Sequence, residues 1–142
     1  MILQSGVIPY RLQADSVEVL LVSSSSGKRW GIPKGWIEPG LSSAESAVKE
    51  AWEEAGVRGT VQLDAIGHYE TRKFGFIFRV EVFLMCVEQE EEIYPEATIR
   101  KRQWVSVNKA IKLVHKSKLK QLLQQTLIQL DLVSDSSLII SY

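Results

Sequence analysis

The sequence of 142 residues has little cysteine, no long hydrophobic run and no excess of charge of either sign. The single Cys86 excludes an internal disulfide, and its place in the apolar run 82–87 favours a buried structural thiol over a nucleophile. No stretch of about 18 apolar residues occurs, so we expect no membrane-spanning helix. The 17 lysines and arginines balance the 17 aspartates and glutamates, so no overall field would attract a nucleic acid, and we expect no nucleic-acid partner.

The length of the chain is typical of one domain with a sizeable core, so we expect a single domain over residues 1–142. No internal repeat or low-complexity linker divides the chain. The N-terminus lacks a basic segment followed by a long apolar core, and a cytoplasmic location is the expectation from that pattern. The sequence leaves open whether the protein is a monomer or a homodimer.

Apolar periodicity predicts the order of the elements. Strands are expected over 5–12, 17–22, 28–35, 60–70 (with a bulge at Gly67), 76–85 and 99–107. Helices are expected after Ser42, after Asn108 as an N-cap, and after Ser117, where leucines recur at helical spacing. The order indicates an α/β (α+β) protein in which helices sandwich a mixed sheet.

Two further segments are harder to place. The acidic run 88–92 favours a solvated hairpin loop. The tail over about 132–142 has an uncertain role, and the apolar composition of residues 137–142 favours an edge strand or a dimer contact over disorder.

The stretch from Gly35 to Val57 combines a turn-rich loop with an acidic helix. Ser42 and Glu45 form a capping box, and Gly56 stands where a left-handed glycine ends a helix. Three carboxylates, on Glu50, Glu53 and Glu54, share one side of this helix. They repel one another by about 0.2–0.5 kcal/mol per i,i+4 pair, and a cation between them would reverse the sign. Carboxylate oxygens suit Mg²⁺ or Mn²⁺, although most acidic helix faces are simply solvated.

This stretch resembles the Nudix box, G-x5-E-x7-R-E-U-x-E-E-x-G-U, in which U is a bulky aliphatic residue. Gly35 matches its first glycine, and the second half is matched by Glu50, Glu53, Glu54, Gly56 and Val57. Leu41 stands in place of the first glutamate and Lys49 in place of the arginine. Lysine lacks the planar fork of arginine, so the bracing between loop and helix is in question, and Glu38 is a candidate to replace the missing acid.

The resemblance implies the Nudix α/β/α sandwich and a metal-dependent hydrolase of diphosphate linkages. It implies Mg²⁺ or Mn²⁺ as cofactor, with Gly35 (through its carbonyl), Glu50, Glu53 and Glu54 as metal ligands and the three glutamates as the catalytic residues. Nudix enzymes often use a further glutamate outside the box, and Glu70, Glu81 or a member of the run 88–92 are candidates here.

The flanking segments resemble the diphosphoinositol polyphosphate phosphohydrolases, some of which also cleave diadenosine polyphosphates. That resemblance implies a highly phosphorylated small molecule as substrate. Basic residues are the candidates to bind it, although each alone is often a solvated charge: Arg11, Lys28, Arg29, Lys34, Arg72 and Arg102. Lys73, Arg100 and Lys101 are further basic residues of the same segments that could meet its charges.

Two alternatives follow from the same residues. The departures at Leu41 and Lys49 favour a catalytically silent Nudix module that binds a nucleotide or a protein. An RNA 5′-end pyrophosphohydrolase would need an electrostatic track for a strand, and the zero net charge argues against it.

Overall fold

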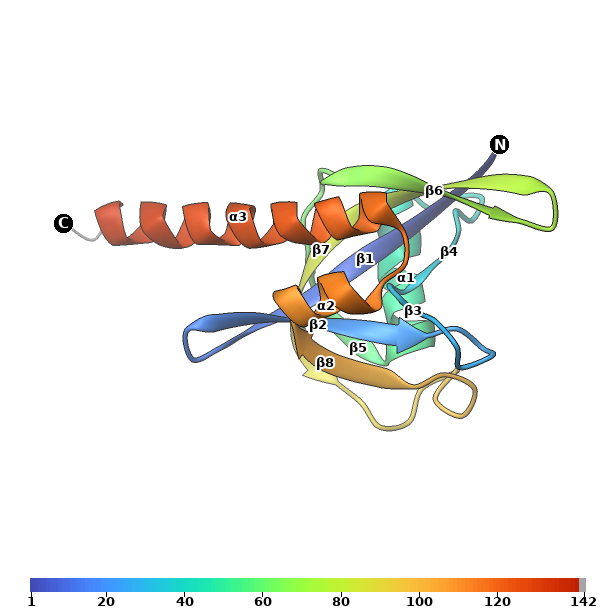
Figure 1. Ribbon diagram of the computed structural model, residues 1–142, viewed down its shortest axis with the longest axis horizontal. Coiled ribbons are helices and arrows are strands. Elements are labelled where there is room, and N and C mark those ends of the chain that lie inside the picture. Colours follow the sequence, from blue (N-terminus) through green and yellow to red (C-terminus); the bar gives the residue numbers. More distant parts are fainter. Residues whose placement is uncertain (141–142) are drawn as a thin grey trace.

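The structure is a computed structural model that describes the backbone of residues 1–140 and the side chains of residues 1–130. The described residues form eight strands and three helices. Figure 1 labels them along the chain. In chain order they are β1 (Ile2–Gln13), β2 (Ser16–Ser23), β3 (Trp30–Gly31), β4 (Lys34–Trp36), α1 (Ser43–Ala55), β5 (Val57–Val61), β6 (Gly67–Lys73), β7 (Phe76–Glu90), β8 (Arg102–Ser106), α2 (Val107–Leu113) and α3 (Ser117–Ile140).

The eight strands form one mixed sheet. Its main path runs β3-β2-β1-β7-β5, with β8 paired to β2, β4 to β1 and β6 to β7. The central pair, β1 and β7, is parallel, and the other pairs are antiparallel. The long strand β1 pairs with β2 near its end and with β4 near its start, where Gly6 lies opposite Lys34. This pairing fixes the loop before α1 against the sheet.

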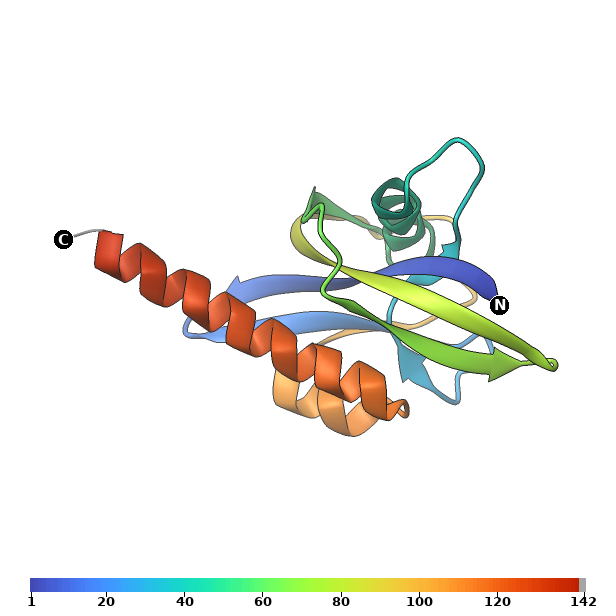
Figure 2. The same ribbon diagram turned by 90° about the horizontal axis from the view of Figure 1, so that it is seen from above.

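Helices cover both faces of the sheet, as Figure 2 shows with α1 on one side and α2 and α3 on the other. Alternate residues of β7 serve the two cores. Val80, Val82 and Leu84 belong to the core under α2 and α3, whereas Phe83 and Met85 belong to the core under α1. The predicted sandwich of helices around a mixed sheet is confirmed.

Helix α1 forms as its sequence predicts. Ser42 accepts a hydrogen bond from the Glu45 backbone N–H at 3.0 Å, and the Glu45 carboxylate accepts one from the Ser42 N–H at 2.9 Å. Gly56 ends the helix in the left-handed region at φ 67°. Ala47 and Ala51 are fully buried, and their small side chains let the helix lie close on the sheet.

The strands of the second half differ from the prediction. The strand expected over 60–70 is two strands, β5 and β6, and both pair with β7. The irregularity in pairing lies between Arg58 and Gly59 and not at Gly67. A methyl group on Gly59 would lie 1.9 Å from the Cys86 carbonyl oxygen, so this close approach of two backbones requires glycine.

Cross-strand pairing also changes two other boundaries. The run 88–92 is not wholly a loop, because β7 continues to Glu90 and its last residues pair with Val57 and Arg58. The strand expected over 99–107 is shorter, since β8 covers Arg102–Ser106. Each boundary depends on a partner strand that is distant in sequence.

The C-terminal helices start and end differently from the prediction. Ser106, and not Asn108, caps α2, and its hydroxyl accepts from the Lys109 N–H at 3.2 Å. The predicted last helix is present as α3, but it includes Ser117, the expected cap, as its first residue. It continues to Ile140, so residues 137–140 are helical and form no edge strand. Residues 141–142, and the side chains on which a dimer contact of the tail would depend, lie outside the described part. None of the described helices is long and apolar enough to cross a membrane.

The turn between β6 and β7 is strained at Phe74. Phe74 and Gly75 have φ values of 52° and 79°, and positive φ at both central residues is the mark of a type I′ turn, which favours Asn-Gly. The Phe74 side chain is 86% exposed. We expect Phe74→Asn to raise the free energy of unfolding by about 1 kcal/mol, because asparagine tolerates the left-handed region. Urea denaturation checks this, and Phe74→Ala, which keeps the strain, should show no gain.

Candidate functional site

Three carboxylates meet beside the C-terminal half of α1. Glu50 and Glu54 lie one helical turn apart, and Glu96 joins them from the loop after β7. One oxygen of each lies within 4.8 Å of the others. Glu54 is only 7% exposed. Three carboxylates at this separation are a donor set for a hard divalent cation, because that charge offsets their mutual repulsion.

Glu96 is the carboxylate of this cluster that the sequence prediction missed. The Glu96 backbone N–H donates to the Glu53 carbonyl at 3.0 Å, so its loop folds across the end of α1. Arg100 Nε then donates to the Glu96 carboxylate at 2.7 Å. The predicted candidates outside the box, Glu70 and Glu81, do not join the cluster. No local pattern marks Glu96, since its position depends on a loop that returns to a distant helix.

The loop before α1 lies directly against the cluster. A methyl group on Gly35 would come 2.3 Å from the Glu50 carboxylate, so a larger residue here would displace this side chain where β4 passes it. The neighbouring Lys34 N–H points to Glu54 Oε1 at 3.4 Å. The structure thus brings Gly35 to the predicted glutamates, and a role for its carbonyl as a metal ligand stays a prediction.

Glu53 faces a different partner from Glu50 and Glu54. Lys49 Nζ lies 3.5 Å from its carboxylate and also forms an ion pair and hydrogen bond with Glu38. The Glu38 N–H in turn donates to Ser46 Oγ at 3.1 Å. Lys49 therefore ties the loop to the helix through Glu38, the residue suggested by the sequence as the substitute acid. Glu53 lies beside the cluster but is not one of its three members.

The protonation of the cluster reflects its burial. Burial raises the pKa of Glu54 to about 7, although Arg100 and Lys34 oppose the shift. Burial, followed by the charges of Glu54, Glu53 and Glu96, also raises the pKa of Glu50 to about 7. The raised pKa values mean that the negative charges of the two carboxylates are poorly compensated without a cation. The residues therefore suit a divalent metal.

The raised pKa values of Glu50 and Glu54 predict that metal binding releases protons. Since the raised pKa values favour protonated Glu50 and Glu54 below about pH 7, Mg²⁺ binding at pH 6 should release more than one proton per ion. At pH 8.5 both groups are already ionised and the release should approach zero. Calorimetry in buffers of different ionisation enthalpy measures this number. Equal release at both pH values would contradict the assignment of the ligands.

A cavity of about 230 Å³ opens next to Glu54, which is part of its wall. Three serines also line it: Ser23 at the end of β2, and Ser24 and Ser25 in the loop that follows. Its charged lining is mostly cationic: Arg29, Lys34, Lys73, Arg100 and Lys116. Burial lowers the pKa of Lys34, against the attraction of Glu54. The cavity suits a ligand with several negative charges.

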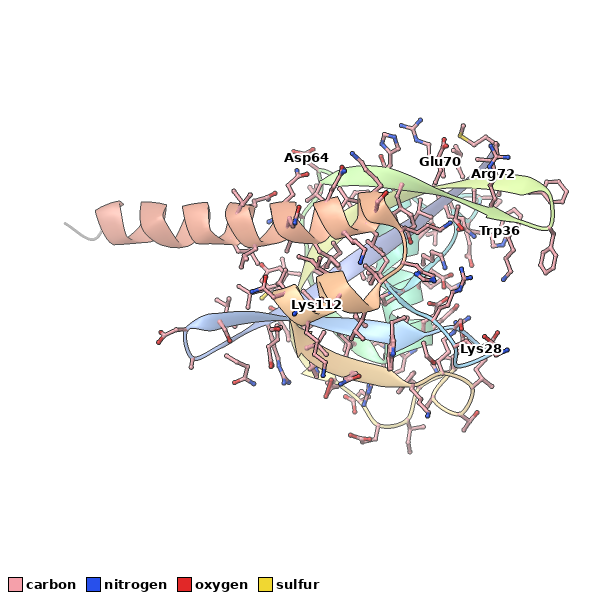
Figure 3. All side chains as sticks on the ribbon, in the orientation of Figure 1. Lys28, Trp36, Asp64, Glu70, Arg72 and Lys112 are labelled. Atoms are coloured by element: carbon pink, nitrogen blue, oxygen red, sulfur yellow. The ribbon has the colours of Figure 1, made fainter. Side chains whose placement is uncertain are left out.

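The predicted substrate-binding residues separate into two groups. Arg29 and Lys34 line the cavity, whereas Arg11, Lys28, Arg72 and Arg102 do not. Arg72 lies between Thr71 and Lys73, which both line the cavity, so strand alternation turns it to the other face. Figure 3 shows Arg72 on β6 and Lys28 on the loop after β2.

Arg11 and Arg102 have structural partners instead. Arg11 pairs with Glu18 at 2.8 Å and its guanidinium lies 4.2 Å from the centre of the Trp104 ring. Arg102 donates to the Ala55 carbonyl at 2.8 Å, at the end of α1, and stacks on Tyr94. Lys73 and Arg100, which the sequence offered only as further members of the basic segments, also line the cavity. Sequence reasoning did not name Lys116, the remaining cation of the lining.

Comparison with known proteins gives the family. A family model described as NUDIX domain matches residues 3–126. The chain is 36% identical over 125 residues to Nudix hydrolase 21, chloroplastic, of Arabidopsis thaliana, covering 84% of this chain and 63% of that protein. It is 37% identical over 102 residues to diphosphoinositol polyphosphate phosphohydrolase 3-alpha of Mus musculus, covering 68% of this chain and 60% of that protein.

The fold is shared with a solved structure, the binary complex of an Ap4A hydrolase from C. elegans. The TM-score is 0.78 at 21% identity, with full coverage of both chains. The chain spans about three fifths of the length of the two curated relatives named above. The match of the family model over most of the sequence shows that this chain belongs to the Nudix family.

Proposed function

We propose that this protein is a metal-dependent hydrolase that cleaves a diphosphate linkage in a highly phosphorylated small molecule. The observation that carries the proposal is the position of Glu54, which belongs both to the three-carboxylate cluster and to the wall of the cationic cavity. A divalent cation held by Glu50, Glu54 and Glu96 would supply charge neutralisation and lower the pKa of a bound water.

The residues of the chain supply the remaining requirements. Lys34, Lys73 and Lys116 line the cavity, and their positive charges would neutralise bridging and terminal phosphates. Arg100 contacts Glu96 at 2.7 Å and Glu54 at 3.8 Å, so it would hold the two carboxylates while its charge faces the cavity. The contact of Lys49 with Glu38 would hold the loop between β4 and α1 in place, and with it the position of Gly35 at the cluster.

The names of the relatives suggest two substrate classes. The mouse relative is named for diphosphoinositol polyphosphates, and the C. elegans protein for Ap4A. Both ligands carry chains or clusters of phosphates that a cavity with five cationic side chains would favour. We therefore include both classes in the proposed substrate range. We also propose the cytoplasm as the site of action.

A hydrolysis screen tests the proposal. The panel holds diadenosine polyphosphates, diphosphoinositol polyphosphates, ADP-ribose, nucleoside triphosphates and 5′-triphosphate RNA, with Mg²⁺ or Mn²⁺. Turnover of a polyphosphorylated small molecule that is lost in Glu54→Gln would support an enzyme with this site. A folded protein that turns over none of these compounds would contradict it and favour the silent module, for which Leu41→Glu and Lys49→Arg are the restoring variants.

A further inference from the structure

The hairpin of β6 and β7 carries exposed apolar side chains at its outer end. Phe74, in the turn, is 86% exposed, and Phe76, at the start of β7, is 59% exposed. Figure 1 and Figure 2 both show this hairpin extending past the rest of the sheet, at the opposite end of the molecule from the end of α3. Because the turn lies beyond the packed part of the sheet, the two rings stay in water unless another surface covers them.

The backbone of the turn makes phenylalanine a costly choice at position 74. The φ of Phe74 is 52°, in the left-handed region that asparagine and glycine tolerate better. The side chain is exposed, so no contact in the core compensates for the strain. A strained residue that the fold itself does not need commonly serves a function. The ring of Phe74 is therefore a candidate for contact with another surface.

The hairpin tip, defined here as residues 71–79, differs in charge from the whole chain. It carries three cations, Arg72, Lys73 and Arg79, and no carboxylate, whereas the chain has a net charge of zero. Glu70, the next carboxylate along β6, lies opposite Arg79 and offsets that charge in part. Among the described side chains, Arg72 and Lys73 form no ion pair. Figure 3 shows Arg72 near the outer end of the hairpin. This charge suits an anionic partner.

We propose that the hairpin tip binds the surface of a membrane that contains anionic lipids. Phe74 and Phe76 insert between the lipid headgroups, and Arg72 and Lys73 meet the negative charges of those headgroups. Burial of apolar area and attraction to anionic lipids are the two contributions that hold a segment at a bilayer surface. The contact is peripheral, and it is independent of the proposed hydrolysis.

The arrangement of the tip favours a bilayer over a nucleic acid. The Nζ of Lys73 lies 5.5 Å from the centre of the Phe74 ring, so a cation and an apolar ring stand together at the turn. The attraction of a charged membrane falls off within about 8 Å at physiological ionic strength, so cations act only when they lie this close to the inserted group. A single strand of nucleic acid is instead held in a groove that tracks its backbone, and a protruding turn has the opposite shape.

Binding to lipid vesicles tests the proposal. The whole chain is mixed with vesicles of phosphatidylcholine, with or without phosphatidylserine, and the bound fraction is measured by co-sedimentation at rising lipid concentration. The wild type should bind the vesicles with phosphatidylserine about 10-fold or more tightly than those without it, because the tip is cationic. Phe74→Asn should weaken binding to the phosphatidylserine vesicles by about 10-fold or more, as the loss of a buried aromatic ring predicts.

The choice of variants excludes unfolding as the cause of lost binding. Phe74→Asn is expected to stabilise the fold by relieving the strain of the turn. Phe74→Ala, which keeps the strain, should lose the same binding. Phe74→Trp should retain the binding, since an indole suits the membrane interface. Brominated lipids should then quench the fluorescence that the new indole adds to that of the four native tryptophans.

Two further variants separate the charge of the tip from general effects. Arg72→Gln should weaken binding to the phosphatidylserine vesicles by about 5-fold and leave binding to phosphatidylcholine unchanged. Leu63→Ala removes an exposed apolar side chain from the loop between β5 and β6, at the other end of β6, and should change neither affinity.

Three results would overturn the proposal: a wild type that binds no vesicles, equal affinity for the two kinds of vesicle, or binding that Phe74→Asn leaves unchanged. Other partners would be recognised in the same way. Phe74-dependent binding of an oligothymidylate, or Phe74-dependent self-association in sedimentation velocity, without vesicle binding would assign the tip to a nucleic acid or to a second copy of the chain. The vesicle assays need no turnover, so their outcome is separate from that of the hydrolysis screen.

Discussion

Glu54→Gln is expected to lower kcat by about 1000-fold while the protein stays folded. Glu54 is the most buried member of the carboxylate cluster, and it accepts from the Lys34 N–H and faces Arg100. Glutamine keeps the shape and removes the charge, which matters most when charge is redistributed in the transition state. Initial rates at saturating Mg²⁺, with the best substrate of the screen, measure the loss.

Stability provides the check that the variant has not simply unfolded. The raised pKa of Glu54 means that its ionised form is unfavourable in the metal-free fold, and this penalty is fully present above about pH 7 and absent below about pH 4.5. Glu54→Gln should therefore be at least as stable as the wild type at pH 8 without metal. Mg²⁺ should stabilise the wild type more than the variant.

A surface glutamate supplies the matched control. Glu70 lies on β6 opposite Arg79, is exposed, and stands outside the carboxylate cluster. Glu70→Gln should leave kcat and the response to Mg²⁺ unchanged. Near-normal turnover by Glu54→Gln, or an equal loss in Glu70→Gln, would show that the reaction does not use the cluster at α1.

Local patterns explain why parts of the fold could be predicted from sequence. The capping box of Ser42 and Glu45 and the end of α1 at Gly56 depend on contacts within a few residues, and both are confirmed. The split between β5 and β6 and the extension of β7 to Glu90 depend on cross-strand pairing. The acidic run after Val87 carries no apolar alternation, so its pairing with β5 has no signal in the local sequence.

In the candidate site, too, the residues set by local structure could be predicted, and those set by distant contacts could not. Glu50 and Glu54 could be found because one helix sets their spacing, and the charge of Glu54 contributes, after burial, to the raised pKa of Glu50. Glu96 and Arg100 reach them from a loop whose path is fixed by backbone bonds to α1, such as the one from Glu96 to Glu53. Arg102 shows the opposite error. Its charge suggested a residue that binds phosphate, but in the fold it donates to a carbonyl at the end of α1.

Gly35→Ala is expected to lower kcat by about 100-fold or more with little loss of stability. The new methyl group would lie 2.3 Å from the Glu50 carboxylate, and that flexible side chain, and not the backbone, would give way. Displacement by about 1 Å or more at a reacting centre commonly costs about 100-fold in rate. The same shift would remove a carboxylate from the cluster, so the affinity for Mg²⁺ should fall as well. Kinetics and calorimetry on one preparation measure both effects.

A double-mutant cycle tests whether Gly35 acts through Glu50. If the methyl group acts only by displacing that carboxylate, Gly35→Ala should add little to the loss already caused by Glu50→Gln, because the glutamine no longer supplies the charge that is displaced. Two independent losses would instead multiply in kcat. Multiplied losses, or a Gly35→Ala variant that binds Mg²⁺ as tightly as the wild type, would show that the glycine serves the loop and not the cluster. Close additivity with Glu70→Gln provides the reference for an uncoupled pair.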